Sequence, residues 1–150
     1  MNKPTISIEK LTKFSSEDMT DIKRLTAMLG VNFKPLTDAD LQEMVSSPNL
    51  FLFVAREQEK QHVIGMILLA VYRIPYTKKA YLDDLVVDEE FRGQAIGSRL
   101  LQTAIDMAQK LGASYAELTS NPKRITSNKL YEKFGFTKRE TNVYRLIYDK

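Results

Sequence analysis

The segment best suited to chemistry runs from Arg92 to Gly97, with the sequence RGQAIG. Small residues at positions 93, 95 and 97 keep side chains out of the way, so consecutive backbone N–H groups can converge on one point. A helix that begins directly after this segment would add the N–H groups of its first turn and the positive end of its dipole. Such donors form a site suited to a phosphate or a diphosphate. The residues alone also allow a simpler interpretation, a tight strand-to-helix turn that needs small residues for packing.

Two common phosphate loops are excluded by the spacing. No Gly-Lys-Ser/Thr follows at the proper distance, so the segment is not a P-loop. Its glycines do not match the G-x-G-x-x-G of dinucleotide-binding folds either. If the segment binds phosphate, it belongs to another class of loop.

Hydrophobic periodicity predicts the elements that would hold this loop. The β-prone run YLDDLVV at 81–87 predicts a strand before it, and apolar residues at helical spacing up to Leu111 predict a helix after it, which Gly112 ends. Upstream we expect a strand over 6–14, a helix that Ser15 or Ser16 caps and Gly30 closes, a second helix from Thr37, and a hairpin formed by the runs 50–55 and 63–71. Downstream we expect a short strand over 115–119, a short helix over 126–134, and two β-like stretches at the end.

The order β-α-α-β-β-β-α-β-α-β-β indicates an α/β protein (α+β mixed sheet). A strand–helix–strand unit requires a parallel crossover, whereas the hairpin before it is antiparallel. We therefore expect a central mixed sheet of six to seven strands flanked on both faces by about four helices. No repeat, low-complexity tract or linker divides the sequence, so one domain over residues 1–150 is expected.

Composition narrows the class of protein. The 22 Lys and Arg residues against 19 Asp and Glu residues give a net charge of +3, and the dispersed charges disfavour a nucleic-acid partner. With no cysteine and a single histidine, His62, neither a thiolate nor a histidine-rich metal site is expected. His62 falls in the predicted hairpin loop, where a solvated side chain is the expectation. The sequence has no signal-peptide core and no apolar run near the roughly 20 residues of a membrane span, so we expect a cytoplasmic protein without a membrane partner.

Placed between these elements, Arg92 to Gly97 resembles the Q/R-x-x-G-x-G/A motif of the GNAT superfamily of N-acetyltransferases. The strand that ends in VVD, the small-residue loop that opens a helix, and the later LYEKFGF at 130–136 occur in the order of that family. The resemblance spans at least residues 80–136. It implies a GNAT-like fold and an enzyme that transfers the acetyl group of acetyl-CoA to an amine by direct attack in a ternary complex.

The resemblance also implies roles for particular residues. The backbone of Leu85, Val86 and Val87 would pair with the pantetheine arm of acetyl-CoA, and Asn128 would contact that arm. Tyr131 matches the tyrosine that often protonates the departing thiolate. The diphosphate would be held by the loop and the helix start, residues Arg92, Gly93, Gln94, Ala95, Ile96, Gly97 and Ser98. Ala95 departs from the family, which usually has glycine there; if this residue has a positive φ, alanine costs roughly 1 kcal/mol.

Acetyl transfer also needs proton transfers, and several side chains are candidates. Asn128 and Tyr131 are three residues apart, so they share one face of the predicted short helix, and a phenol with a pKa of about 10 holds its proton at neutral pH. The alternative for Tyr131 is a ring packed beside Leu130 and Phe134.

A general base is expected among the carboxylates of the sheet. Asp83 and Asp84 lie between apolar residues of a predicted strand, and consecutive strand residues face opposite sides, so only one can face the active cleft. We place Asp84 ahead of Asp83, and Glu117 on the neighbouring strand is a third candidate. The alternative is that one carboxylate is solvated at an edge and the other caps a loop.

The acceptor is left open as an amine-bearing small molecule or peptide, because in this fold variable loops set it. Arg73, Lys78 and Lys79 would favour an acceptor that carries a carboxylate or a phosphate. A non-catalytic module that binds CoA or acetyl-CoA is the alternative function. The alternation of Val143, Tyr144, Ile147 and Tyr148 is explained by sheet packing or by a subunit contact, which makes a homodimer one expectation.

Overall fold

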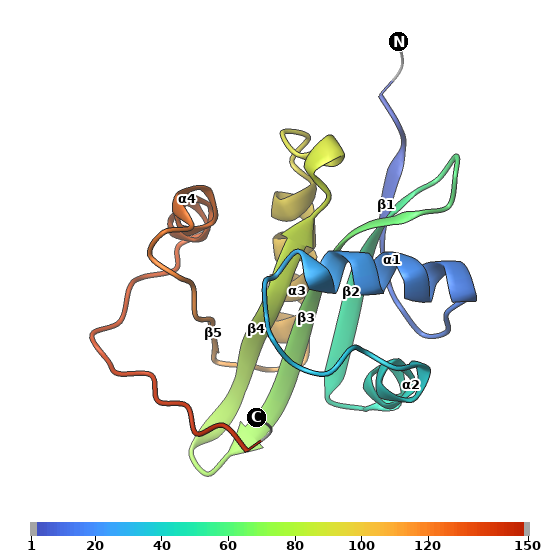
Figure 1. Ribbon diagram of the computed structural model, residues 1–150. Helices are drawn as coiled ribbons and strands as arrows, with labels where there is room; N and C mark the ends of the chain where they lie inside the picture. Colours follow the sequence, from blue (N-terminus) through green and yellow to red (C-terminus); the bar gives the residue numbers. More distant parts are fainter. Residues whose placement is uncertain (1–2, 149–150) are drawn as a thin grey trace. The chain divides into compact units, whose positions relative to one another are not determined.

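A computed structural model describes residues 3–148, which fall into two units, one through Leu118 and one from Thr119 on (Figure 1). The units are described separately, and the single domain expected over 1–150 stays a prediction. The strands of the first unit are β1 (Ile6–Lys10), β2 (Leu50–Glu57), β3 (Val63–Ile74), β4 (Thr77–Val87) and β5 (Tyr115–Glu117). Its helices are α1 (Ser16–Ala27), α2 (Asp38–Ser46), the 3-10 turn η1 (Glu89–Phe91) and α3 (Ile96–Lys110). The second unit contains α4 (Ile125–Lys133).

The sheet has the strand order β1-β2-β3-β4-β5. Pairing is antiparallel from β1 to β4, and β4 pairs with β5 in parallel. The parallel step follows from the α3 crossover, and the β2–β3 hairpin is antiparallel as predicted. The expected mixed sheet is therefore confirmed.

Helices cover both faces of this sheet. In Figure 1, α1 and α2 lie in front of the sheet and α3 lies behind it. On the α1/α2 face, Leu25 and Leu41 join Leu52, Val54 and Met66 of the sheet in one buried core. Alternate strand residues such as Phe53 and Ala55 are also buried and point toward α3, whose own buried side chains begin at Ile96.

The first two helices begin where the sequence predicts. Ser15 caps α1 by accepting the Asp18 N–H, while the Asp18 carboxylate accepts the Ser15 N–H. Thr37 and Asp40 form the same reciprocal capping box at the start of α2. Each box satisfies two backbone donors that the first helical turn would otherwise leave unpaired.

The end of the first strand and the number of strands in the sheet differ from the prediction. β1 ends at Lys10 and not at Phe14, because the chain turns there to reach the cap of α1, and Phe14 packs against the α1/α2 core. The sheet has five strands and not six to seven, since no strand is found over 137–148. An alternating sequence forms a strand only when a neighbouring strand pairs with it. In the described structure Val143 and Tyr144 instead remain 74% and 88% exposed.

Candidate functional site

The predicted phosphate loop lies where β3 begins and β4 ends. The Asp88 N–H donates to the Ile64 carbonyl at 2.8 Å, which holds the C-terminal end of β4 against the start of β3. Gly65, paired with Val87, lets α3 approach closely: a Cβ at Gly65 would lie 3.2 Å from Leu100 Cδ1 and 3.2 Å from the Val86 carbonyl oxygen. The first turns of α3 therefore rest directly on the strand ends that flank the loop.

The loop reaches α3 through two left-handed residues. Gly93 has a φ of 78° and Ala95 a φ of 60°, while Arg92 between η1 and Gly93 is extended. Ala95 is also the N-cap of α3, and it has no side-chain cap hydrogen bond. The glycine that the family usually has at this position is therefore replaced by a residue with a Cβ in a conformation that costs an L-residue energy.

The backbone of this loop presents a row of donors. The N–H groups of six consecutive residues, Gly93 to Ser98, have no acceptor among residues 3–148, whereas the next one, Arg99 N–H, donates to the Ala95 carbonyl at 3.0 Å. Nothing within 4 Å would meet a Cβ at Gly93, so there is open space beside this residue. A row of free N–H groups at the positive end of a 15-residue helix fits a diphosphate group well.

The Arg92 side chain contacts the backbone at the end of β4. Its Nε donates to the Val87 carbonyl oxygen at 3.2 Å, and the residue is exposed. The hydrogen bond folds the loop back on the end of β4. Leu85 and Val86 are buried and Val87 is half-buried, so the strand that leads into the loop is anchored on both faces of the sheet.

A β-bulge interrupts β4 at the two predicted carboxylates. Asp83 pairs with Leu68 and Val86 pairs with Met66, so Asp84 and Leu85 lie opposite one residue of β3. Asp84 takes the left-handed conformation, with a φ of 59°, which aspartate tolerates better than most residues. The bulge breaks the strict alternation on which the choice between Asp83 and Asp84 rested, and both are exposed.

The surroundings of Asp83 change the proton affinity of its carboxyl group. Partial loss of solvent and, second, the neighbouring charge of Asp84 raise the pKa of the Asp83 carboxyl. A raised pKa makes Asp83 a stronger base than an ordinary aspartate. Glu117 ends β5 and lies 4.0 Å from Lys79 Nζ, so its charge is already compensated by a structural partner.

Two lysines of the β3–β4 hairpin make contacts within the first unit. Lys78 Nζ donates to the Leu111 carbonyl at 3.0 Å, at the C-terminal end of α3. Lys79 Nζ lies 5.6 and 5.7 Å from the ring centres of Tyr72 and Tyr115. These contacts stabilise the hairpin, which leaves Arg73 as the exposed cation among the three predicted to favour an anionic acceptor.

In the second unit, Asn128 and Tyr131 lie on one face of α4. Asn128 donates one amide N–H to the Asn121 carbonyl at 3.1 Å, which fastens the loop before the helix. The Tyr131 ring packs edge-on against Phe136, with ring centres 6.0 Å apart, and not against Phe134. Burial raises the pKa of the Tyr131 phenol, an effect that Arg124 opposes. The phenol therefore stays protonated at neutral pH, as a proton donor must.

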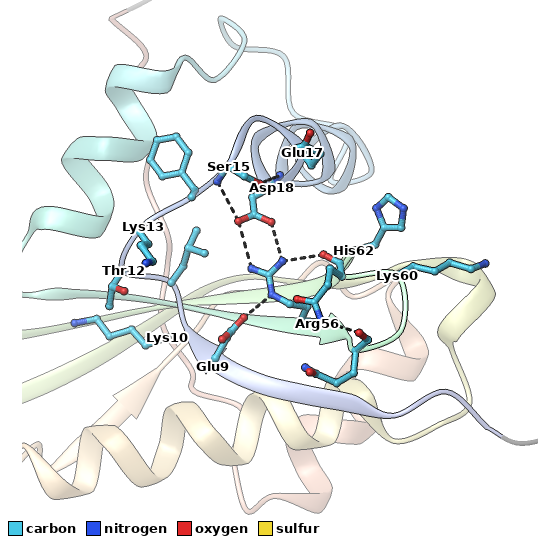
Figure 2. Close-up of a pocket in the computed structure, with 14 residues that line it drawn as sticks. Glu9, Lys10, Thr12, Lys13, Ser15, Glu17, Asp18, Arg56, Lys60 and His62 are labelled. Carbon is cyan, nitrogen blue, oxygen red and sulfur yellow. Dashed lines mark hydrogen bonds and ion pairs between the residues drawn. The ribbon is translucent and has the colours of Figure 1, made fainter.

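A cavity of about 760 Å³ lies elsewhere on the first unit (Figure 2). It is formed by β1, the β1–α1 loop, the start of α1 and the β2–β3 hairpin, and none of its lining residues is a predicted site residue. At its base Arg56 contacts Glu9 and, at 2.8 Å, Asp18. Burial would raise the pKa of Asp18, but Arg56 and the backbone of Ser15 together hold it below its ordinary value. The cluster joins α1 to β1 and β2.

The predicted hairpin loop holds His62, with its side chain 54% exposed. Its Nδ1 lies 3.2 Å from Asp21, so the side chain is both solvated and paired with α1. Within residues 3–148, no group of three or more His, Cys, Asp or Glu side chains could hold a metal ion. None of the helices in that range is long and apolar enough to cross a membrane.

Comparison of the sequence with known protein families identifies the family to which this chain belongs. The Acetyltransferase (GNAT) family matches residues 16–136, which include both helices of the α1/α2 face, the loop and α4. The chain belongs to the GNAT acetyltransferase family. The GNAT fold is shared with a solved acetyltransferase of Trypanosoma brucei, with a TM-score of 0.80, 21% identity, and coverage of 95% of this chain and all (100%) of that one.

Two curated relatives of this GNAT protein are named for the amines that they acetylate. The aminoalkylphosphonate N-acetyltransferase of Salmonella typhimurium is 40% identical over 55 residues, which are 37% of this chain and 36% of that protein. A Drosophila melanogaster protein named for glucosamine 6-phosphate N-acetylation is 28% identical over 97 residues, 63% of this chain and 43% of that protein. The matches thus span less than half the length of either relative.

Proposed function

We propose that this GNAT acetyltransferase is an N-acetyltransferase that uses acetyl-CoA as the acetyl donor and a primary amine as the acceptor. The observation that carries the proposal is the row of free N–H groups from Gly93 to Ser98 at the start of α3. A diphosphate is the part of acetyl-CoA that needs such donors. Residues 93 to 98 would hold it, and the backbone of Leu85 to Val87 would align the pantetheine arm beside β4.

In the proposed reaction the amine nitrogen attacks the thioester carbonyl carbon, a C–N bond forms, and the C–S bond breaks. The amine must lose a proton and the departing sulfur must gain one. We assign the first proton to a carboxylate of the β4 bulge, either Asp84 or Asp83, and the raised pKa of Asp83 supports that residue as a base. We assign the second to the Tyr131 hydroxyl, which stays protonated at neutral pH.

For the acceptor, we propose a small amine that also carries a phosphonate or a phosphate. Support comes from the two curated relatives, both of which are named for amines of this kind. The matched controls are therefore amines of the same skeleton without the anionic group, such as glucosamine beside glucosamine 6-phosphate.

The experiment that tests the proposal has two stages. A ligand that binds only the folded state at a hundredfold excess over its dissociation constant raises stability by about 2.7 kcal/mol. Acetyl-CoA should therefore raise the melting temperature by several degrees, and pantetheine, which lacks the phosphates, should do much less. A millimolar concentration of acetyl-CoA that leaves the melting temperature unchanged would refute the assignment.

Thiol release with a panel of amines then separates catalysis from binding. We expect release to depend on both the amine and the protein. Binding of acetyl-CoA without thiol release for any amine in the panel would support the alternative, a non-catalytic CoA-binding module.

A further inference from the structure

Arg24, near the end of α1, connects that helix to the entrance of the diphosphate loop. Its Nη1 donates to the Asp88 carboxylate, and its Nη2 donates to the Val63 carbonyl at 3.1 Å. Val63 is the first residue of β3, and Asp88 comes directly after the last residue of β4. One guanidinium therefore contacts both strand ends at the point where the loop begins.

Buried neighbours hold this guanidinium in place. Asp21, only 5% exposed, accepts the Arg24 Nη2–H at 3.2 Å and the Val63 N–H at 3.0 Å. The Asp88 side chain is 17% exposed, and the Asp88 N–H is fixed by Ile64. The Arg24–Asp88 contact thus joins two positioned groups, unlike most surface ion pairs.

The charge of Asp88 matters because it is the first of three consecutive acidic residues, Asp88, Glu89 and Glu90, directly before the loop. The turn keeps these carboxylates close to the loop, since the Phe91 N–H donates to the Asp88 carbonyl at 3.0 Å and the Arg92 side chain returns to Val87. An uncompensated carboxylate at this place would repel a bound diphosphate over the Debye length of about 8 Å at physiological salt.

We propose that Arg24 is a positioning residue for the donor site, which acts by neutralising Asp88 beside the diphosphate loop. The inference rests on the proposed function, because it concerns the affinity of the same loop for coenzyme A. Arg24 does not contact the reacting atoms. Its effect should therefore appear in the binding of the donor and not in the chemical step.

The test measures coenzyme A binding by calorimetry for wild type, Arg24→Gln and Arg24→Gln/Asp88→Asn. Lys23→Gln is the matched control, since Lys23 is exposed on the same helix and the change in charge is identical. We expect Arg24→Gln to raise Kd by about three- to tenfold, the effect of one uncompensated carboxylate within about a Debye length of the bound diphosphate. KM for acetyl-CoA should rise with it while kcat is unchanged, and the loss should shrink at high salt.

The double variant separates charge from architecture. Asp88→Asn removes the charge that Arg24 compensates, so it should restore most of the affinity lost in Arg24→Gln. A double variant as weak as Arg24→Gln would show a purely structural role and overturn the inference. So would Arg24→Gln with wild-type affinity, or Lys23→Gln with an equal loss.

Two further outcomes are also decisive. A wild-type protein that does not bind coenzyme A would overturn the proposed function together with this inference, whereas the outcomes above overturn the inference alone. If Arg24→Gln does not fold, Arg24→Lys replaces it, because lysine keeps the charge. It should bind coenzyme A within about twofold of wild type, and a loss of about tenfold or more would refute the role of charge.

Discussion

Ala95→Gly should stabilise the protein, against the usual effect of glycine at the start of a helix. Ala95 has a φ of 60° and a ψ of 20°. The left-handed conformation costs a residue with a Cβ about 1–2 kcal/mol, and glycine adopts it without that cost. Glycine also loses about 0.4–1 kcal/mol through the greater entropy of the unfolded chain. The net gain is then roughly 0.5–1 kcal/mol, or a rise in Tm of roughly 1–4 °C for a chain of this length.

The assay is denaturant unfolding together with thermal melting, without ligand, beside Ala39→Gly as the matched control. Ala39 is exposed in the first turn of α2, a right-handed helix, so the same chemical change should destabilise the protein there by about 0.5–1 kcal/mol. Opposite signs at the two positions are the expected result. Equal destabilisation at both would refute the argument that Ala95 is strained.

Three further outcomes are expected. Gly97→Val should weaken acetyl-CoA binding by crowding the first turn of α3, and full affinity in a calorimetric titration would show that this loop does not hold the diphosphate. Tyr131→Phe should lower the single-turnover rate of acetyl transfer by about 10²–10⁴-fold with little change in acetyl-CoA affinity, the range for a positioned general acid; a wild-type rate would leave Tyr131 a packing role. The lowered folded-state pKa of Asp18 stabilises the protein above the unfolded pKa of about 3.9, so its contribution should be lost as pH falls through the lowered value. Urea unfolding from pH 7 to pH 2 should therefore show a smaller acid-induced loss for Asp18→Asn than for wild type, and identical pH profiles would contradict the pairing with Arg56.

Local chemistry made much of the fold predictable. The starts of α1 and α2 can be predicted from Ser15 and Thr37, because a capping box involves only residues three positions apart. The β2–β3 hairpin and the helix after the loop follow from periodicity and turn residues in the same way. At Ala95 the sequence posed the alternative of positive or negative φ, and the structure gives the positive one.

The features that the sequence could not predict depend on contacts between distant segments. The bulge at Asp84 is set by the register of β4 against β3, so alternation along β4 alone predicts the wrong faces. The Arg24–Asp88 contact joins residues 64 positions apart, and nothing in the local sequence of α1 distinguishes Arg24 from Lys23 beside it. The roles of Asp83, Asn128 and Tyr131 remain predictions, which substitutions at these positions would test.

The bulge in β4 also decides where the chain can change in length. Asp83 and Val86 lie on the same face of the sheet although they are three residues apart, because the extra residue shifts the two-residue period of the strand. Deleting Asp84 would remove the extra residue and leave Asp83 and Val86 on their present face, opposite Leu68 and Met66. Deleting one residue elsewhere in β4 would instead turn the side chains of one half of the strand to the opposite face and carry core residues out of the core. An insertion in the exposed turn at 75–76 would leave that period intact. Tolerance of insertions and deletions should therefore change sharply along one strand, and relatives that differ in length should differ at the hairpin tip or at the bulge and not between them.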